Sequence, residues 1–294
     1  MSEPFRISAH GRLQDWIADE HGYFSDEGLD YEIAVRTLEN AEQDIVVSDR
    51  SDVRVGAYEL YRAGASGKRD MSCACHWAVN QAASDAAGRM WGRAYSVLPS
   101  AIFVPASSPV TSPEQLAGVP VTVGYHSGSH FSTIQALEAC VEPADVRLAF
   151  GGMPYDRVDM LLAGKAQATA AWGAATYILE QLGARRIIDT TFMAAFMFDA
   201  QSDTDDVERY FAGLSRAQAA LDFAPERHKH HYLREIPERY CQRVDVRRFG
   251  TGERIVFEPY TREMYEQAQE WMREHDLFEE LGGEAPDYAA VVQA

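Results

Sequence analysis

Short apolar runs alternate with amphipathic segments along most of the chain, which predicts that strands and helices follow one another. The amino-terminal part begins with an apolar strand at 5–10, an amphipathic helix at 11–23 and a second strand at 30–35. A helix is expected at 55–63 and another strand at 71–75. This order of elements is typical of an α/β fold.

The alternation continues in the middle of the chain. A long apolar run at 94–105 is long enough to pass between two domains, and a strand at 185–190 is expected to carry the chain back. The elements expected between them are helices at 112–118, 131–141 and 155–163 and strands at 119–124, 145–150 and 168–172. Beyond residue 205 the pattern is mostly helical.

Composition and charge narrow the classes of protein and partner. A chain of 294 residues, 46% hydrophobic and 24% charged, fits a soluble protein of two ordinary domains. The net charge of −18 argues against nucleic acid and anionic membranes as partners, although it allows a small anionic ligand held by local arginines or helix ends. No membrane insertion is expected, and a homodimer is compatible with the sequence. The amino terminus lacks the pattern of a secretory signal and there are only four cysteines, so a cytoplasmic location is expected.

The segment from Cys73 to Trp77 places two thiols and an imidazole between a predicted strand and a predicted helix at 78–89. Ligands of open α/β sheets bind at such strand ends. Cys75 beside His76 could serve as a thiolate nucleophile whose pKa is lowered by an imidazolium and a helix amino terminus. The alternative is a small buried cysteine beside a satisfied core histidine. Strand alternation predicts that Cys73 and Cys75 share a face.

Several segments resemble a known superfamily. They are the Gly-Tyr-Phe-Ser-Asp-Glu-Gly-Leu turn at 22–29, the strand after Asp70, the segment at 112–124 and the turn at 161–168. Together they resemble the type II periplasmic-binding-protein fold, within its sulfonate/nitrate-binding and thiamine-pyrimidine-synthase-like group. That group includes transporter receptors and also cytoplasmic enzymes similar to dihydroxyphthalate decarboxylase and to an aromatic sulfinate desulfinase.

The resemblance implies a two-lobed α/β fold, each lobe a mixed, mostly parallel sheet flanked by helices, with the ligand cleft between the lobes. Lobe 1 is then discontinuous, formed by 1–100 and 190–294, and lobe 2 spans 101–189. Four segments should face the cleft: 9–12, 73–77, 125–130 and 171–173. Three of the four contain histidine, which suggests acid/base chemistry at near-neutral pKa by His10, His76 and His126.

Within these segments the clearest expectation is an anion site. Ser127, Gly128, Ser129 and His130 open a predicted helix, where backbone N–H groups and hydroxyls favour a carboxylate, sulfonate or phosphate. The alternative is ordinary helix capping with nothing bound. Gly11 is expected to lie beside His10 at the ligand, since it belongs to the first of the four segments.

Other candidate residues are less distinctive. Arg54 matches the position of a substrate-binding arginine in the desulfinase-type enzymes, although an exposed arginine paired with Asp52 is the better interpretation. Trp77 and Trp172 could stack on an aromatic ligand or belong to the core. No cofactor is expected; a metal held by the Cys-X-Cys-His group with His10, His126 or His130 is an alternative. The His228-Lys229-His230-His231 tract is interpreted as a solvated helical face rather than a metal site.

Two functions remain open at this stage. The first is a cytoplasmic lyase, resembling the decarboxylases, that acts on a small carboxylated and aromatic substrate between the lobes. In that case Cys75, His76, His10 and His126 would do the chemistry, and Cys73, Trp77, Trp172 and the helix start at 127–130 would bind the substrate. The second is a binding protein, either the receptor of an importer or a sensor of an organic anion.

Overall fold

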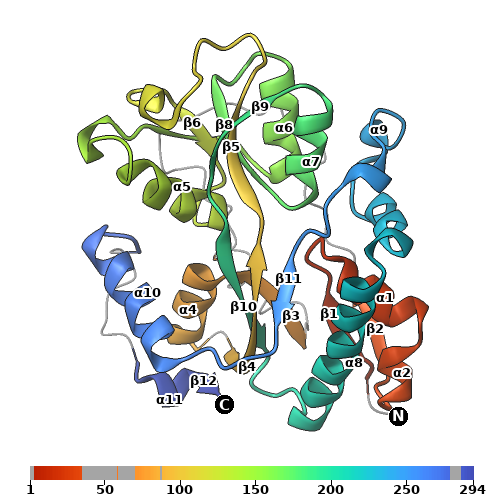
Figure 1. Cartoon of the computed structure of the whole chain (residues 1–294). Helices are drawn as coiled ribbons and strands as arrows, with labels where there is room; N and C mark the ends of the chain where they lie inside the picture. The colour runs from red at the N-terminus through yellow and green to blue at the C-terminus, as the bar shows by residue number, and fades with distance from the viewer. Residues whose placement is uncertain (1–2, 35–57, 59–69, 87, 279–285) are drawn as a thin grey trace.

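The computed structural model describes residues 3–34, 58, 70–86, 88–278 and 286–294 (Figure 1). Arg54 and most of the helix expected at 55–63 lie outside the described residues. The described elements form two sheets, one in each lobe of the molecule (Figure 1). The predicted α/β fold with two lobes is confirmed.

Lobe 1 is built on a seven-stranded sheet in the order β11-β4-β10-β3-β1-β2, with β12 beside β4. The strands are β1 (Phe5–Ser8), β2 (Tyr31–Ala34), β3 (Met71–Cys75), β4 (Arg89–Leu98), β10 (Phe192–Phe198), β11 (Arg254–Val256) and β12 (Val292–Gln293). β1 pairs with β2 and β3 in parallel, whereas β10 runs antiparallel to both β3 and β4. The sheet is therefore mixed, as expected.

Helices cover both faces of this sheet. α1 (Leu13–Glu20), α2 (Tyr23–Asp26) and α8 (Thr204–Phe223) pack together over one buried cluster. α4 (His76–Ser84) and α10 (Arg262–Glu274), with the short α11 (Tyr288–Val291), pack over a second cluster on the other side (Figure 1). α10 is strongly amphipathic: its Tyr265, Ala268 and Met272 are buried among mostly charged neighbours.

Lobe 2 is built on a five-stranded sheet in the order β7-β6-β8-β5-β9. The strands are β5 (Ser100–Val104), β6 (Val121–Val123), β7 (Leu148–Phe150), β8 (Ala168–Trp172) and β9 (Arg185–Asp189), and the helices are α5 (Gly128–Glu138), α6 (Pro154–Leu162) and α7 (Ala174–Gln181). β6, β7 and β8 are parallel, so α5 and α6 are the crossover helices between them. The amino ends of both helices consequently lie at one edge of the sheet.

Two neighbouring segments of the chain cross from one lobe to the other. β4 continues into β5 after Pro99, and β9 continues into β10 after Thr190, so the two connections run side by side (Figure 1). Two hydrogen bonds join Thr190 to Ser100. The Thr190 backbone N–H donates to the Ser100 carbonyl at 2.8 Å, and the Thr190 hydroxyl donates to the Ser100 hydroxyl at 2.8 Å. These bonds hold the two connecting segments together at the junction of the lobes.

Contacts away from these connections also join the lobes. On one side, Arg239, in the short α9 (Glu238–Cys241), binds Asp159 at 2.7 Å. On the other side, His275 lies 2.9 Å from Glu138 of α5. These two contacts bridge the lobes at places away from the connecting segments.

Some expected elements differ in detail. The run at 94–105 is two strands interrupted at Pro99, because proline lacks the backbone N–H that a continuous ladder requires. The helix expected at 112–118 is a single 3₁₀ turn at Pro113–Leu116. β10, β11 and β12 were not expected. Among the described helices, none combines the length and the apolar composition needed to cross a bilayer.

Candidate functional site between the lobes

His10 lies where β1 ends, at the boundary between the lobes. Its ring stacks on Trp172 of lobe 2, with ring centroids 5.3 Å apart and planes inclined by 11°. Its Nδ1 lies 3.2 Å from a carboxylate oxygen of Glu253, just before β11. Gly11, the next residue, adopts a φ of 79°, which turns the backbone from the strand into α1. The fold therefore brings His10, Gly11 and Trp172 to the boundary between the lobes.

Glu253 is the centre of a buried polar network that the sequence analysis did not include. Arg12 donates to Glu253 at 3.3 Å and to Asp15 at 2.8 Å, and Ser96 donates a further hydrogen bond to Glu253. Burial alone would raise the pKa of Glu253, but Arg12 and then His10 lower it to about 2. Glu253 is thus an ionised carboxylate that fixes the orientation of the His10 ring.

Cys73 borders the same network. Its Sγ lies 3.8 Å from Glu253, but burial raises its pKa well above that of a free thiol, which keeps it protonated. The ligand atoms of His10, Cys73 and Glu253 all lie within 4.8 Å of one another, so these three residues could hold a metal ion. The guanidinium of Arg12 already neutralises part of the Glu253 charge, which disfavours a second cation at this place.

A second group of polar residues lies at the amino end of α5. The Ser127 hydroxyl donates to the Gly124 carbonyl at 2.7 Å and lies 2.8 Å from the Ser129 hydroxyl. The Ser129 hydroxyl accepts from the Gly124 backbone N–H at 3.0 Å. Neither serine caps the helix with its side chain, and no acceptor for the Gly128 and Ser129 backbone N–H groups is found among the described residues. Plain capping, the alternative to an anion site, therefore does not account for these side chains.

Arg157 of α6 reaches this helix start from the neighbouring crossover. It is 2% exposed and donates to the Ser129 hydroxyl at 3.3 Å, the Gly152 carbonyl at 2.6 Å and the Ala170 carbonyl at 3.3 Å. No carboxylate in the described part of the chain forms an ion pair with it. Burial lowers its pKa to about 10, and only the adjacent Asp156 opposes that shift. Arg157 is therefore a buried cation with little compensating negative charge, and it lies beside the amino end of α5.

Aromatic side chains connect the two groups. Trp172 packs against two buried clusters that include residues of both lobes, and one of them contains Trp77, Phe131 and Phe192. The ring of Phe192 lies so close to Gly128 that a Cβ there would meet it at 2.3 Å. Only glycine fits at that position of α5. Ser127 and Trp172 remain partly exposed, so a ligand can reach both.

His126 and His130 join an aromatic group on the α10 side of the boundary. His126 lies 4.2 Å from Phe278, measured between ring centroids, and adopts a φ of 42°, unusual for a residue with a Cβ. His130 lies 4.9 Å from Phe131, and burial followed by the neighbouring His126 lowers its pKa to about 3. Trp77 contacts the same group at 5.7 Å from Phe131. His130 is neutral near pH 7.

The thiolate–imidazolium pair expected at Cys75 and His76 does not form. Burial raises the pKa of Cys75 to about 12 and lowers that of His76 to about 3, so both groups are neutral. His76 Nδ1 lies 3.2 Å from the Tyr260 hydroxyl, whose oxygen also accepts from Asn80 at 2.9 Å. The expectation of a near-neutral pKa for His76 is wrong, because α10 and the residues before it cover the start of α4.

Cys73 and Cys75 also lie in different surroundings. Cys73 belongs to the cluster under α1 and α8, next to Glu253, whereas Cys75 belongs to the cluster under α4 and α10. Cys75 is the last residue of β3 and the residue before α4, where strand alternation no longer determines its neighbours. The prediction that Cys73 and Cys75 share a face of the sheet is therefore wrong.

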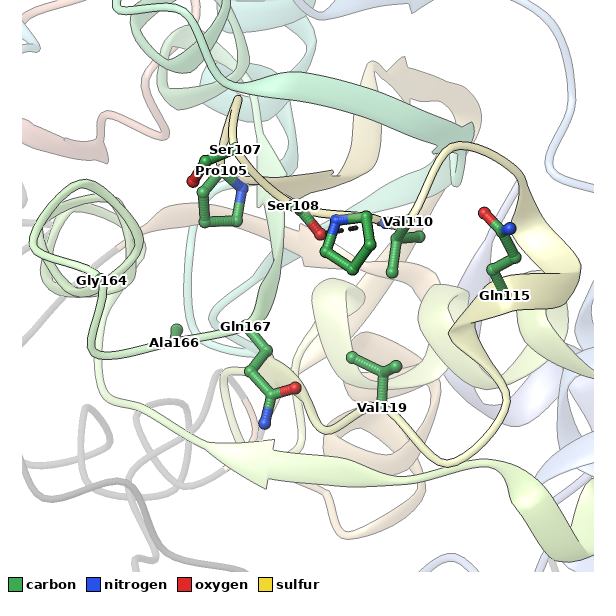
Figure 2. Close-up of a pocket in the computed structure, with 10 residues that line it drawn as sticks. Pro105, Ser107, Ser108, Val110, Gln115, Val119, Gly164, Ala166 and Gln167 are labelled. Carbon is green, nitrogen blue, oxygen red and sulfur yellow. Dashed lines mark hydrogen bonds between the residues drawn. The ribbon is translucent and has the colours of Figure 1, made fainter.

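A surface pocket of about 620 Å³ lies in lobe 2, away from these residues (Figure 2). It is lined by Pro105, Ser107, Ser108, Pro109, Val110, Gln115, Val119, Gly164, Ala166 and Gln167. No charged side chain lines it, and none of its residues was expected from the sequence to bind a ligand. It offers no positive charge to an anion.

Sequence analysis missed Arg157 and Glu253. Arg157 follows Pro-Tyr-Asp in an amphipathic helix, where an arginine usually faces solvent. Glu253 follows Gly250-Thr-Gly and is buried just before β11 begins. The glycines at 250 and 252 were the available signal. Both residues act at the site through partners far away in the sequence.

Several solved structures have a fold similar to that of this chain. The alkanesulfonate-binding protein SsuA from Xanthomonas axonopodis pv. citri, bound to MOPS, is 15% identical, with a TM-score of 0.71 over 100% of this chain and 99% of that one. The desulfurization enzyme DszB, in a cysteine-to-serine variant bound to biphenyl-2-sulfinic acid, is 13% identical, with a TM-score of 0.60 over 94% and 93%.

A Candida albicans protein described as having the generic periplasmic-binding-protein fold is 12% identical, with a TM-score of 0.59 over 92% of this chain and 81% of that one. No protein-family model matches the sequence, and no curated protein resembles it in sequence. The predicted periplasmic-binding-protein fold is confirmed, and structures with this fold include both binding proteins and an enzyme.

Proposed function

We propose that this chain, which has the periplasmic-binding-protein fold, binds a small organic anion between its lobes. The observation that carries the proposal is Arg157, a buried guanidinium with no ion-pair partner among the described residues, set beside the amino end of α5. A negative group would compensate that charge by accepting hydrogen bonds from the free N–H groups of Gly128 and Ser129. It would also accept from the Ser129 hydroxyl, whose single hydrogen would then turn from Ser127 to the ligand. The overall charge of −18 makes this local cation more distinctive.

The organic part of the ligand is proposed to be aromatic. Trp172 and His10 present stacked rings at the same boundary, and Phe192 lies against Gly128. Such surfaces favour flat apolar groups. Similar folds bind MOPS, a sulfonate, in SsuA and biphenyl-2-sulfinic acid in DszB, which supports an acid with an organic tail.

Mass spectrometry of small molecules released from the purified protein is the first test, because closed lobes retain ligand. Isothermal titration with benzoate, benzenesulfinate and benzenesulfonate, and with uncharged benzamide as the matched control, then measures the requirement for charge. We expect at least one anion to bind and benzamide to bind much more weakly. Equal binding of the neutral and charged compounds would contradict an anion site.

A second candidate function is a lyase, and the His10–Glu253 contact favours it. In a decarboxylation, the bond between the carboxyl carbon and the ring breaks, its electron pair stays on the ring carbon, and CO₂ leaves. A proton must then reach that carbon, and His10, whose Nδ1 lies 3.2 Å from Glu253, would deliver it as the imidazolium. Cys75 and His76 have no part in this proposal because both are buried and neutral.

Turnover separates the two candidates. The molecule retained by the protein is incubated with it, and release of CO₂ or of sulfur oxyanion is measured over time. For a lyase we expect product from the wild type and none from His10→Gln, which keeps the anion site and still binds. Binding without product in the wild type would leave the binding protein as the function.

A further inference from the structure

Four histidines and one glutamate gather at the far end of α1 from Arg12. The 3₁₀ segment at Lys229–Arg234 packs against α1, so His228, His230 and His231 meet Glu20 and His21. This cluster is separate from the lobe boundary described above. The sequence analysis interpreted the tract at 228–231 as a solvated face, but His228 is 5% exposed and His231 only 1%. That interpretation is wrong for two of its three histidines.

The carboxylate of Glu20 lies at the centre of the cluster. His231 Nε2 is 3.0 Å from one of its oxygens, and His230 Nε2 is 3.6 Å from the other. The rings of His230 and His231 are 4.0 Å apart, and His21 and His228 lie 5.6 Å from each other. Within each of two trios, Glu20 with His230 and His231, and Glu20 with His21 and His228, all ligand atoms lie within 4.8 Å.

The hydrogen bond of His230 determines which of its nitrogens is available. Nδ1 lies 2.9 Å from the Arg227 carbonyl, which can only accept, so Nδ1 carries the hydrogen. Because Nδ1 is engaged, Nε2 is the nitrogen that faces the Glu20 carboxylate, 3.6 Å away, and it is the atom that a cation between the two residues would bind. A backbone carbonyl that binds the other ring nitrogen is the usual second contact of metal-binding histidines.

The buried histidines supply further donors. The Nδ1 atoms of His228 and His231 are buried and have no hydrogen-bond partner among the described residues. The adjacent basic side chains are engaged elsewhere, Lys229 with Glu226 at 2.6 Å and Arg234 with Asp19 at 3.7 Å.

We propose that Glu20, His230 and His231 form a site for a divalent transition metal, with Zn²⁺ as the representative ion. Imidazole nitrogen with carboxylate oxygen is a donor set that suits Zn²⁺, Cu²⁺ and Ni²⁺ rather than Mg²⁺ or Ca²⁺. His21 and His228 form the second trio with the same Glu20 carboxylate. The ion joins the end of α1 to the segment after α8, so its role is to stabilise lobe 1.

The test is titration of protein purified without a polyhistidine tag with ZnCl₂ alone. We expect one ion per chain, a higher melting temperature in its presence, and an affinity at least about tenfold weaker in His230→Ala and in Glu20→Gln. Cu²⁺ bound at the same place should show nitrogen hyperfine coupling in electron paramagnetic resonance spectra. His230 is exposed, so its alanine variant should keep the fold, which circular dichroism checks.

Two controls make the outcome decisive. His275→Ala removes a histidine that also faces a carboxylate, Glu138 at 2.9 Å, but belongs to neither trio, and it should leave Zn²⁺ affinity unchanged. Cys73→Ser tests the other donor group, His10, Cys73 and Glu253. The proposal is overturned if the wild type shows no saturable Zn²⁺ binding, if His230→Ala and Glu20→Gln bind as tightly as the wild type, or if Cys73→Ser alone abolishes binding.

Discussion

Replacing Arg157 with glutamine tests how the anion is held. An anionic oxygen that accepts from the Ser129 hydroxyl would lie about 5 Å from the guanidinium, which is 3.3 Å from that hydroxyl. Two unit charges about 5 Å apart attract each other by about 3 kcal/mol at an effective dielectric constant of about 20. Loss of that attraction corresponds to an affinity roughly 100-fold weaker. We therefore expect Arg157→Gln to weaken binding of the organic anion by about that factor.

The assay is isothermal titration of wild type and variant with the anion that the wild type binds. Arg157→Gln also leaves the Gly152 and Ala170 carbonyls without the guanidinium, so about 1–3 kcal/mol of unfolding free energy should be lost as well. Arg185→Gln is the matched control, because Arg185 also donates to three carbonyls, those of Ala106, Ser108 and Val110, but away from α5.

Arg157→Lys keeps the positive charge without the planar donor group, and it should restore part of the affinity. The reasoning is refuted if Arg157→Gln binds the anion within about twofold of the wild type, or if Arg185→Gln weakens binding as much as Arg157→Gln does.

Three further predictions concern stability and the separate roles of the predicted residues. Glu253 has a folded pKa of about 2, below its unfolded value, so the stability that it contributes is present above about pH 4.5 and is lost as the pH falls toward 2. Glu253→Gln should therefore lower the free energy of unfolding at pH 7 by about 3 kcal/mol. Denaturant titrations of the variant should also lack this acid dependence. Burial would lower the pKa of His275, but Glu138 outweighs it and raises that pKa. The ion pair between His275 and Glu138 is therefore present at low pH and weakens as the pH rises through the folded pKa. Small-angle scattering between about pH 6 and pH 8 should show the lobes opening in the wild type and no such change in His275→Gln. Cys75→Ser should leave anion affinity and any turnover unchanged, and a loss of turnover with an intact fold would return Cys75 to the chemistry.

The fold could be predicted because its signals are local. The alternation of apolar strands with amphipathic helices and the segment at 112–124 are read directly along the chain, and the two sheets follow from them. β10 and β11 were missed for a different reason. β10 is apolar at nearly every position, so its sequence has no period, and β11 is three residues long.

Prediction of the site was limited by contacts between distant segments. His10 and Trp172 were named because strand ends mark ligand sites, and the structure stacks their rings. The environment of His76 depends on Tyr260, far along the chain, and that of His10 depends on Glu253. Burial by such residues sets the pKa, so a cysteine next to a histidine in the sequence does not by itself predict a reactive thiol.

The most direct measurement is a crystal structure of the protein with 4-bromobenzoate or 4-bromobenzenesulfonate, with bromine located by its anomalous scattering. We predict that the acid group accepts hydrogen bonds from Gly128 and Ser129 at the start of α5, about 5 Å from the Arg157 guanidinium, and that bromine lies toward Trp172 and His10. Bromine found only in the pocket between Pro105 and Gln167, or only at the outer surface, would contradict an anion site between the lobes.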